Sequence, residues 1–278
     1  MFVHSTCVAI LIILCSLRCD CSQIYGLNET KALIEIKAQL AELRLEEEKQ
    51  GNQLEEILWR LNPLNIGTYK RSCLEAAPAS SGIFMIRIPG YSNQPFKVVC
   101  EETDHGSGWT VILRRQDGSV DFYRNWNDYK NGFGNLNGEF FLGFDKIHAL
   151  TADQSQQLLV LLEDGDGQKR YEKYDRFAVG DELESYALHT LGKAEGSAGD
   201  SLRKHLGLRF STYDKSNGVD PRNCAVLYTG AWWYQRCHES HLTGKYGDNT
   251  SGKGINWFSF RGHLHSLKYA VMMVRPIK

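Results

Sequence analysis

The chain has 278 residues, a length that allows one large β-rich domain together with an extension. Its 32 basic residues are balanced by 33 acidic ones, so the formal net charge at pH 7 is -1. This balance argues against a nucleic-acid partner, because a protein that binds a phosphate backbone needs a positively charged surface.

The N-terminal segment, residues 1–21, is predicted to be a secretory signal peptide. Its apolar run covers residues 8–14, and Cys19 and Cys21 are small residues at the positions that permit cleavage after Cys21. A membrane anchor is the alternative, but the run is far shorter than the ~20 residues that span a bilayer. We therefore expect a secreted, extracellular chain that does not insert into a membrane.

Residues 22–62 are predicted to form a helical stalk. Proline is absent from residues 29–61, and Glu, Lys, Leu, Ala and Gln, which favour helices, dominate this stretch. Apolar residues recur in heptads at two seam positions, Leu33, Leu40, Leu54 and Leu61 at one and Ile36, Leu43 and Ile57 at the other. Such a seam predicts a coiled coil and self-association of the chain. A helix that folds back on its own domain is the alternative.

The composition changes after Pro63, where glycines, aromatic residues and short alternating runs replace the charged helix. We expect a linker over residues 63–72 and a β-rich mixed domain over residues 73–278. Strands are predicted at 84–88, 96–99, 109–114, 140–144 and 158–163, and short helices at 126–130 and 200–205.

Four cysteines remain after removal of the signal peptide, namely Cys73, Cys100, Cys224 and Cys237. In an oxidising compartment we expect them to form two disulfides, and three pairings are open in principle. If cleavage falls earlier, Cys19 or Cys21 would remain as candidates for bonds between chains. Paired cysteines offer no thiolate, so neither a cysteine nucleophile nor a thiolate metal site is expected.

The sequence motifs of enzymes are not met, and we expect a protein without catalytic activity. The run from His238 to His241 has one residue too few for the helical zinc pattern, and the segment 164–168 lacks the glycine and glutamate of a calcium loop. Aromatic residues instead gather near the C-terminus. Those around the last two cysteines, together with Arg236 and His238, predict a shallow ligand pocket.

Several strings in the domain resemble the C-terminal globular domain of the fibrinogen family. They include Gly106–Ile112, Arg114–Phe122, Gly138–Gly143, Ala198–Leu202, Gly230–Tyr234 and Cys237-His238, in that order. The resemblance covers residues 73–278 and implies an α+β fold that has a central antiparallel sheet and a loop-rich C-terminal subdomain. It also implies that Cys73 pairs with Cys100 and Cys224 with Cys237.

The resemblance further implies a binding pocket beside the second disulfide, next to a cis peptide between Arg236 and Cys237. Related domains recognise acetylated sugars or peptide ends there. Tyr228, Cys237 and His238 match pocket positions of the family, and Arg236, Tyr234, Tyr246 and Trp257 are further candidates. The expected function is lectin-like recognition of acetylated or microbial glycans in innate immunity. An angiopoietin-like signalling ligand for a cell-surface receptor is the alternative.

The family's calcium loop is altered in this sequence. Ser216 and Gly218 stand at the two positions that normally supply carboxylate ligands, while Asp214 and Asp220 flank them. Because calcium prefers several anionic oxygens, we expect a metal-free or very weak calcium site and no other cofactor. Asn28 and Asn249 each begin an Asn-X-Ser/Thr sequence and are predicted glycosylation sites.

Overall fold

The computed structural model describes residues 69–76 and 80–277, together with six positions between residues 35 and 46. The chain divides into two units, Met1–Asn65 and Ile66–Lys278. In the first unit the six described positions, Leu43 among them, are helical and exposed. The predicted signal peptide, the other seam residues, Cys19, Cys21 and Asn28 lie outside the described residues.

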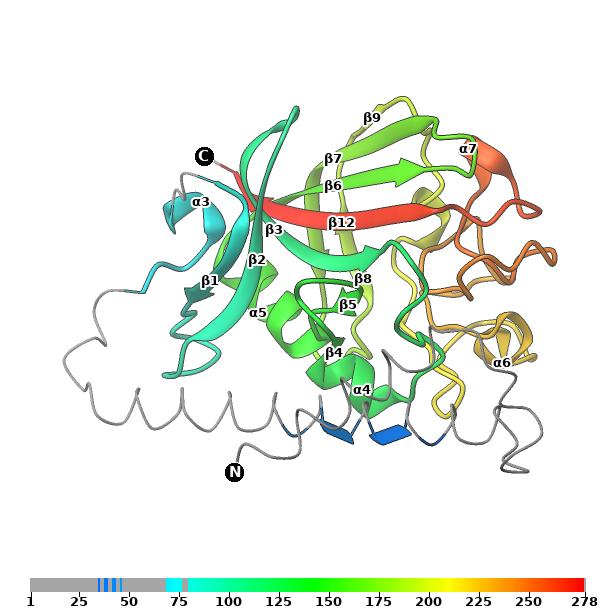
Figure 1. The fold of residues 1–278 in the computed structure, drawn as a ribbon, viewed down its shortest axis with the longest axis horizontal. Coiled ribbons are helices and arrows are strands. Elements are labelled where there is room, and N and C mark those ends of the chain that lie inside the picture. Colours follow the sequence, from blue (N-terminus) through cyan, green and yellow to red (C-terminus); the bar gives the residue numbers. More distant parts are fainter. Residues whose placement is uncertain are drawn as a thin grey trace, which may run out of the picture. The chain divides into compact units, whose positions relative to one another are not determined.

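The second unit contains many strands and a few short helices (Figure 1). In chain order they are α3 (Cys73–Ala76), β1 (Gly82–Ile86), β2 (Phe96–Thr103), β3 (Gly106–Arg115), α4 (Trp126–Asn131), β4 (Phe133–Gly134), β5 (Phe140–Phe141), α5 (Phe144–Asp153), β6 (Gln156–Glu163), β7 (Lys169–Val179), β8 (Leu188–Leu191), β9 (Ala194–Gly196), the 3-10 helix η3 (Arg203–His205), α6 (Cys224–Tyr228), β10 (Ser240–His241), β11 (Asn256–Trp257), α7 (Phe258–Arg261) and β12 (Tyr269–Pro276).

The strands form an α+β fold around one large antiparallel sheet, as the sequence predicts. Among the described residues this sheet has ten strands, and its main path runs β1-β2-β3-β12-β6-β7-β8. The C-terminal strand β12 lies in the middle, paired with β3 on one side and β6 on the other (Figure 1). The loops that carry α6 and α7 gather at one end of the sheet (Figure 1). No helix in the described ranges is both long and apolar enough to cross a bilayer.

The burial of individual strands follows from their place in the sheet. Eight consecutive residues of β3, Gly108–Arg115, are buried, as expected for a strand that is covered on both faces. Strand β7 is less buried, and its buried residues stand between exposed or half-buried neighbours. A register shift between Tyr174 and Phe177 brings both rings into the core. The sheet therefore has a deeply buried centre at β3 and β12 and a partly exposed face along β7.

The segment after β5 departs from the predicted strand over residues 140–144. Strand β5 ends at Phe141, and the chain turns at Gly143 into α5. Gly143 has a φ of 104°, and a Cβ atom there would lie 2.5 Å from the carbonyl of Asn131. Only glycine fits this turn without strain, so the strand stops and a helix begins.

A buried ion pair connects the sheet to the C-terminal loops. Arg115, at the end of β3, and Glu139 are 1% and 0% exposed, and the guanidinium Nε lies 3.4 Å from the Glu139 carboxylate. The Arg115 Nη1 group donates to the carbonyls of Leu242 (3.0 Å) and Gly244 (2.7 Å). Burial lowers the pKa of the Arg115 guanidinium, and the negative charge of Glu139 opposes that shift. One arginine thus ties the central sheet to loops more than 120 residues later.

Candidate functional site

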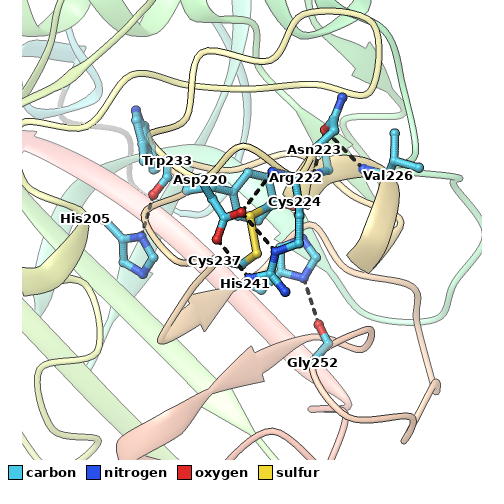
Figure 2. The surroundings of a disulfide bond; sticks show 12 residues. His205, Asp220, Arg222, Asn223, Cys224, Val226, Trp233, Cys237, His241 and Gly252 are labelled. Carbon is cyan, nitrogen blue, oxygen red and sulfur yellow. Dashed lines mark hydrogen bonds and ion pairs between the residues drawn. A yellow bond between two sulfur atoms is a disulfide. The ribbon is translucent and has the colours of Figure 1, made fainter.

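Two disulfides stabilise the domain, and their pairing is the one that the family resemblance implies. Cys73 is bonded to Cys100 across 27 residues, and Cys224 is bonded to Cys237 across 13 residues. The first joins α3 to β2, whereas the second joins α6 to the loop before β10 (Figure 2). Each restricts the unfolded chain and adds ~2–4 kcal/mol of stability in the usual range.

Helix α6 holds the first cysteine of the second disulfide in place. The side chain of Asn223 caps the helix by accepting hydrogen bonds from the backbone N–H groups of Ala225 and Val226 (Figure 2). Asparagine is a favoured residue at this position because its oxygen satisfies N–H groups that lack a partner within the helix. The short helix places Cys224 and Tyr228 one turn apart, beside the second cysteine.

The loop before β10 carries the second cysteine and two free donors. The peptide bond between Arg236 and Cys237 is cis, as expected from the resemblance. The Gln235 N–H donates to the Cys237 carbonyl at 2.8 Å. Within the described residues, neither the Cys237 N–H nor the His238 N–H donates a hydrogen bond. Both groups therefore lack a hydrogen-bond partner in this part of the structure, and of the two residues His238 lines the cavity described next.

A cavity of about 310 Å³ opens at this loop. This volume is at the lower end of the range for small-molecule sites, about 300–1,000 Å³. The lining contains three histidines, one aromatic ring, two cations, one carboxylate and one amide: Lys204, His205, Gln235, Arg236, His238, Glu239, Phe258 and His263. Lys204 and Glu239 form an ion pair with each other. Arg236, the other cation of the lining, forms no ion pair with any described residue.

His238 is the central polar group of this cavity. Its ring lies 4.7 Å from the ring of Tyr228 and 5.2 Å from that of His263, measured between centroids. Both ring nitrogens are buried and form no hydrogen bond of good geometry in the described part of the chain, although the side chain of Asn256 lies close enough to raise the pKa of the ring. Burial, reinforced by repulsion from His241 and His263, lowers the pKa of His238 to about 2. The imidazole is therefore neutral in solution and offers one donor and one acceptor.

Two further histidines form the scaffold behind His238. The Nδ1–H group of His205 donates to the Trp233 carbonyl at 2.6 Å (Figure 2). The Nε2 atom of His205 accepts from the backbone N–H groups of Glu239 and Ser240. His241 binds the Gly252 carbonyl through Nδ1. Burial lowers the pKa of His205 to about 4 and that of His241 to about 3. Both rings are neutral structural groups.

The structure brings some of the predicted site residues together and places others elsewhere. Arg236 and His238 line the cavity, and Cys237 lies between them. The ring of Tyr228 contacts His238 from the side of α6.

The three other tyrosine and tryptophan candidates lie outside the cavity lining. Tyr234 is buried and its hydroxyl binds His241 Nε2 at 2.9 Å, while the Trp257 indole donates to the Gly199 carbonyl. Tyr246 packs against Gly118, and its hydroxyl donates to the Gln116 carbonyl. These rings support the fold around the site and have no free polar group directed into this cavity.

Phe258 and His263 line the cavity but were not among the predicted site residues. Phe258 directly follows the buried Trp257 and is 51% exposed. The ring of His263 lies 5.0 Å from the ring of Phe258. Phe258 is the first residue of helix α7 and directly follows the last residue of β11. No local pattern shows which of the two adjacent aromatic residues faces outward, so the sequence alone did not single out Phe258.

The altered calcium loop does not fit a calcium ion. The Asp214 carboxylate accepts hydrogen bonds from the Trp126 N–H (3.0 Å) and the Thr212 hydroxyl (2.7 Å). The Asp220 carboxylate binds Arg222, which lowers the pKa of Asp220 to about 2. Ser216 and Gly218 provide no carboxylate. The two remaining carboxylates are thus committed to protein donors, and a hard cation would lack anionic ligands.

The Asp220 carboxylate also lies close to the sulfur atoms of Cys224 and Cys237 (Figure 2). Three such groups resemble a metal site in their spacing. Both sulfurs are bonded to each other, however, so neither is a thiolate, and a metal ligand of this kind requires the thiolate.

The predicted glycosylation site at Asn249 lies in an exposed turn. Asn249, Thr250 and Ser251 are all exposed, and the Asn249 Oδ1 atom accepts from the Ser266 N–H at 2.8 Å. The side-chain amide nitrogen, to which a glycan would be attached, takes no part in this hydrogen bond. Glycosylation at this position remains a prediction.

Comparison with known proteins identifies the family of this domain. Residues 70–277 match the family described as the C-terminal globular domain of the fibrinogen beta and gamma chains. The chain belongs to this family.

Curated relatives include tenascin from Gallus gallus, 42% identical over 211 residues, and tenascin-R from Homo sapiens, 44% identical over 196 residues. These matches cover 75% and 70% of this chain but only 12% and 14% of the relatives. The chain thus corresponds to a small part of the curated relatives that it matches.

Solved structures agree with the sequence relatives. The fibrinogen-like globe domain of human ANGPTL2 is 41% identical, with a TM-score of 0.72, and the match covers 74% of this chain and 99% of that domain. The lamprey fibrin D-dimer is 31% identical, with a TM-score of 0.69 and a coverage of 89% of this chain and 92% of that one. That structure was solved with the peptide ligand Gly-His-Arg-Pro-amide.

Proposed function

We propose that this chain is a secreted, non-catalytic recognition protein that binds acetylated sugars, or similar acetylated groups, beside the Cys224–Cys237 disulfide. The observation that carries the proposal is the set of unpaired polar groups at the cavity and at the adjacent residue Cys237. The N–H groups of Cys237 and His238 and the ring of His238 have no well-formed partner. A buried polar group without a partner costs ~1–3 kcal/mol, and a ligand that pairs with it recovers that free energy.

The chemistry of these groups favours an uncharged ligand. Two N–H donors suit a carbonyl oxygen, and the ring of Tyr228 offers an apolar surface for a methyl group. The neutral imidazole of His238 brings no positive charge. Arg236, which lines the same cavity, is the group that could accommodate an anionic substituent elsewhere on the ligand. An acetamido group combines a carbonyl, a methyl group and an N–H donor. It therefore suits the donors of this loop and the ring of Tyr228, which packs against His238 beside the cavity lining.

Secretion and self-association complete the proposal. Two disulfides are typical of proteins that fold in an oxidising compartment, in keeping with a signal peptide over residues 1–21. A coiled-coil stalk over residues 22–62 would present several domains together, and tethered second contacts form at high effective concentration. Light scattering on the mature chain tests this part, because a monomer would exclude multivalent presentation by the stalk.

The substitution His238→Ala tests the binding site. We expect it to weaken binding of N-acetylglucosamine about tenfold or more, because a ligand hydrogen bond and the ring contact with Tyr228 are lost. His265→Ala, which removes an exposed histidine, is the matched control and should bind as wild type. Isothermal calorimetry with and without EDTA measures both effects, and EDTA should change nothing. Equal affinity of wild type and His238→Ala would overturn the proposed site.

A receptor-binding role is the second candidate, and exposed apolar side chains near the site favour it. Val226 and Leu227 on α6 are 49% and 43% exposed, and Phe258 on the cavity rim is 51% exposed. Val226 lies close to the disulfide (Figure 2). Apolar groups clustered at a surface mark protein contacts. Saturable binding to a cell-surface protein that is lost in Val226→Glu, with no binding to any glycan, would favour this role.

A further inference from the structure

A second groove lies away from the Cys224–Cys237 disulfide, between the turn of the β2–β3 hairpin and strands β6 and β7. It has a volume of about 560 Å³. Its lining comes from the end of the hairpin (residues 102–105), from β6 and β7, and from Tyr269 at the start of β12. No lining residue is shared with the cavity beside the disulfide. We call this feature the hairpin groove, and the proposed function makes no use of it.

The floor and one wall of the hairpin groove are apolar and aromatic. Leu161 and Tyr171 are direct partners in the pairing of β6 with β7, and both are half-buried. Tyr269 is also half-buried and pairs with the end of β6. The ring of His105, in the hairpin turn, lies 4.1 Å from the ring of Tyr171. The imidazole of His105 therefore packs against Tyr171, and these two rings together with Tyr269 form the aromatic part of the lining.

The rim of the hairpin groove combines acceptors and donors. The carboxylates of Glu102 and Asp104 are exposed and form no ion pair or side-chain hydrogen bond in the described part of the chain. Lys169 and Arg170 line the opposite side and are also exposed. Lys169 is 3.9 Å from the Glu163 carboxylate, at the limit of an ion pair. Arg170 donates to the Lys169 carbonyl at 3.1 Å. The carboxylates of Glu102 and Asp104 are therefore the unpaired groups beside the aromatic floor.

This arrangement points to a neutral sugar. A pyranose has a C–H face that packs on an aromatic ring, and a ring of hydroxyls that both donate and accept hydrogen bonds. A fatty acyl chain would leave the charged rim unpaired. Three carboxylates in the lining (Glu102, Asp104 and Glu163) disfavour an acidic glycan, and the two cations Lys169 and Arg170 disfavour a basic peptide.

We propose that the hairpin groove is a second binding site, specific for a neutral pyranose unit, with Tyr171 as the stacking surface and Glu102 and Asp104 as acceptors for hydroxyl groups. The volume suits a ligand of this kind, since small-molecule sites span about 300–1,000 Å³. A domain with two separate sugar sites would contact one extended glycan at two points and gain affinity from the linkage.

Calorimetric titration of the mature chain with methyl α-mannoside, methyl β-galactoside and methyl β-glucoside tests this proposal. These probes carry no acetyl group. At least one is expected to bind wild type, with a loss of about tenfold in Tyr171→Ala, which removes the stacking ring. The double variant Glu102→Gln/Asp104→Asn leaves the core untouched and is expected to weaken binding severalfold. Tyr213→Ala removes a tyrosine that is 37% exposed on another loop and serves as the control.

The outcome separates the two sites. His238→Ala should leave binding of these probes unchanged, whether or not it affects N-acetylglucosamine. The proposal is overturned if no neutral pyranoside binds wild type, or if Tyr171→Ala and the double variant both bind as wild type. Saturable binding of tri-lysine in place of the sugars, lost in the double variant, would also overturn it, since the groove would then be a cation site.

Discussion

Replacing Glu139 with alanine is expected to lower the free energy of unfolding by about 3–5 kcal/mol, the usual result of removing one partner from a buried ion pair. The variant leaves the Arg115 guanidinium, 1% exposed, without its counter-charge. It also removes the acceptor for the backbone N–H groups of Gln116 (2.8 Å) and Val120 (3.0 Å). Urea denaturation with both disulfides intact measures the change.

The control for this substitution is Glu195→Ala in β9. Glu195 is exposed and forms no ion pair within the described ranges, so its removal should change stability by less than about 0.5 kcal/mol. If Glu139→Ala costs under 1 kcal/mol, the buried pair does not connect the sheet to the C-terminal loops in the way described above.

Acidification is expected to destabilise the domain between about pH 6.5 and pH 4. Burial keeps His205, His238 and His241 neutral in the folded state, with pKa values of about 4, about 2 and about 3, whereas the unfolded chain protonates them near the ordinary value of about 6.5. The unfolded state therefore binds more protons in this window, and stability falls as pH falls. Within this window each histidine lowers the free energy of unfolding by about 1 kcal/mol for each pH unit of acidification.

His205→Gln isolates one of these contributions. The slope of the unfolding free energy against pH, measured by denaturation at pH 6.5, 6, 5.5 and 5, should decrease by about one proton relative to wild type. The same comparison at pH 8, where His205 is neutral in both states, measures the loss of its hydrogen bonds alone. An unchanged slope would show that His205 is not held neutral by the fold.

Local sequence patterns predicted most of the individual elements. The alternating or buried runs that form β2, β3 and β6 were recognisable, and so was the short helix α4. Helix α5 was missed because its apolar residues Phe144, Ile147 and Leu150 directly continue a strand-like aromatic run. The turn between the two elements depends on the close approach of Gly143 to Asn131, which no local pattern reveals.

The arrangement of the strands was accessible only through the family resemblance. The central place of β12 results from pairing with β3 and β6, segments more than 100 residues earlier in the chain. Local propensity contains no information on such pairings. The resemblance also supplied the two disulfides and the position of His238 next to the second cysteine.

The site was predicted in part, for a similar reason. Arg236 and His238 are neighbours of Cys237 in the sequence, and both line the cavity, although their role in ligand binding remains a prediction. Phe258 and His263 come from a later loop, and Lys204 from η3, and only the folded chain brings them together. The calcium loop shows the same limit. The residue types at its ligand positions are evident from the sequence. The contact of Asp214 with the Trp126 N–H spans 88 residues, so only the folded chain shows it.

The central claim is that the N–H groups of Cys237 and His238 hold an acetyl carbonyl. A titration of the ¹⁵N-labelled mature chain with N-acetylglucosamine, and in parallel with glucose, tests it most directly by NMR. We predict that the amide signals of Cys237 and His238 shift saturably with N-acetylglucosamine and stay in place with glucose. Unmoved signals at saturation with the acetylated sugar, or equal shifts with both sugars, would contradict the claim.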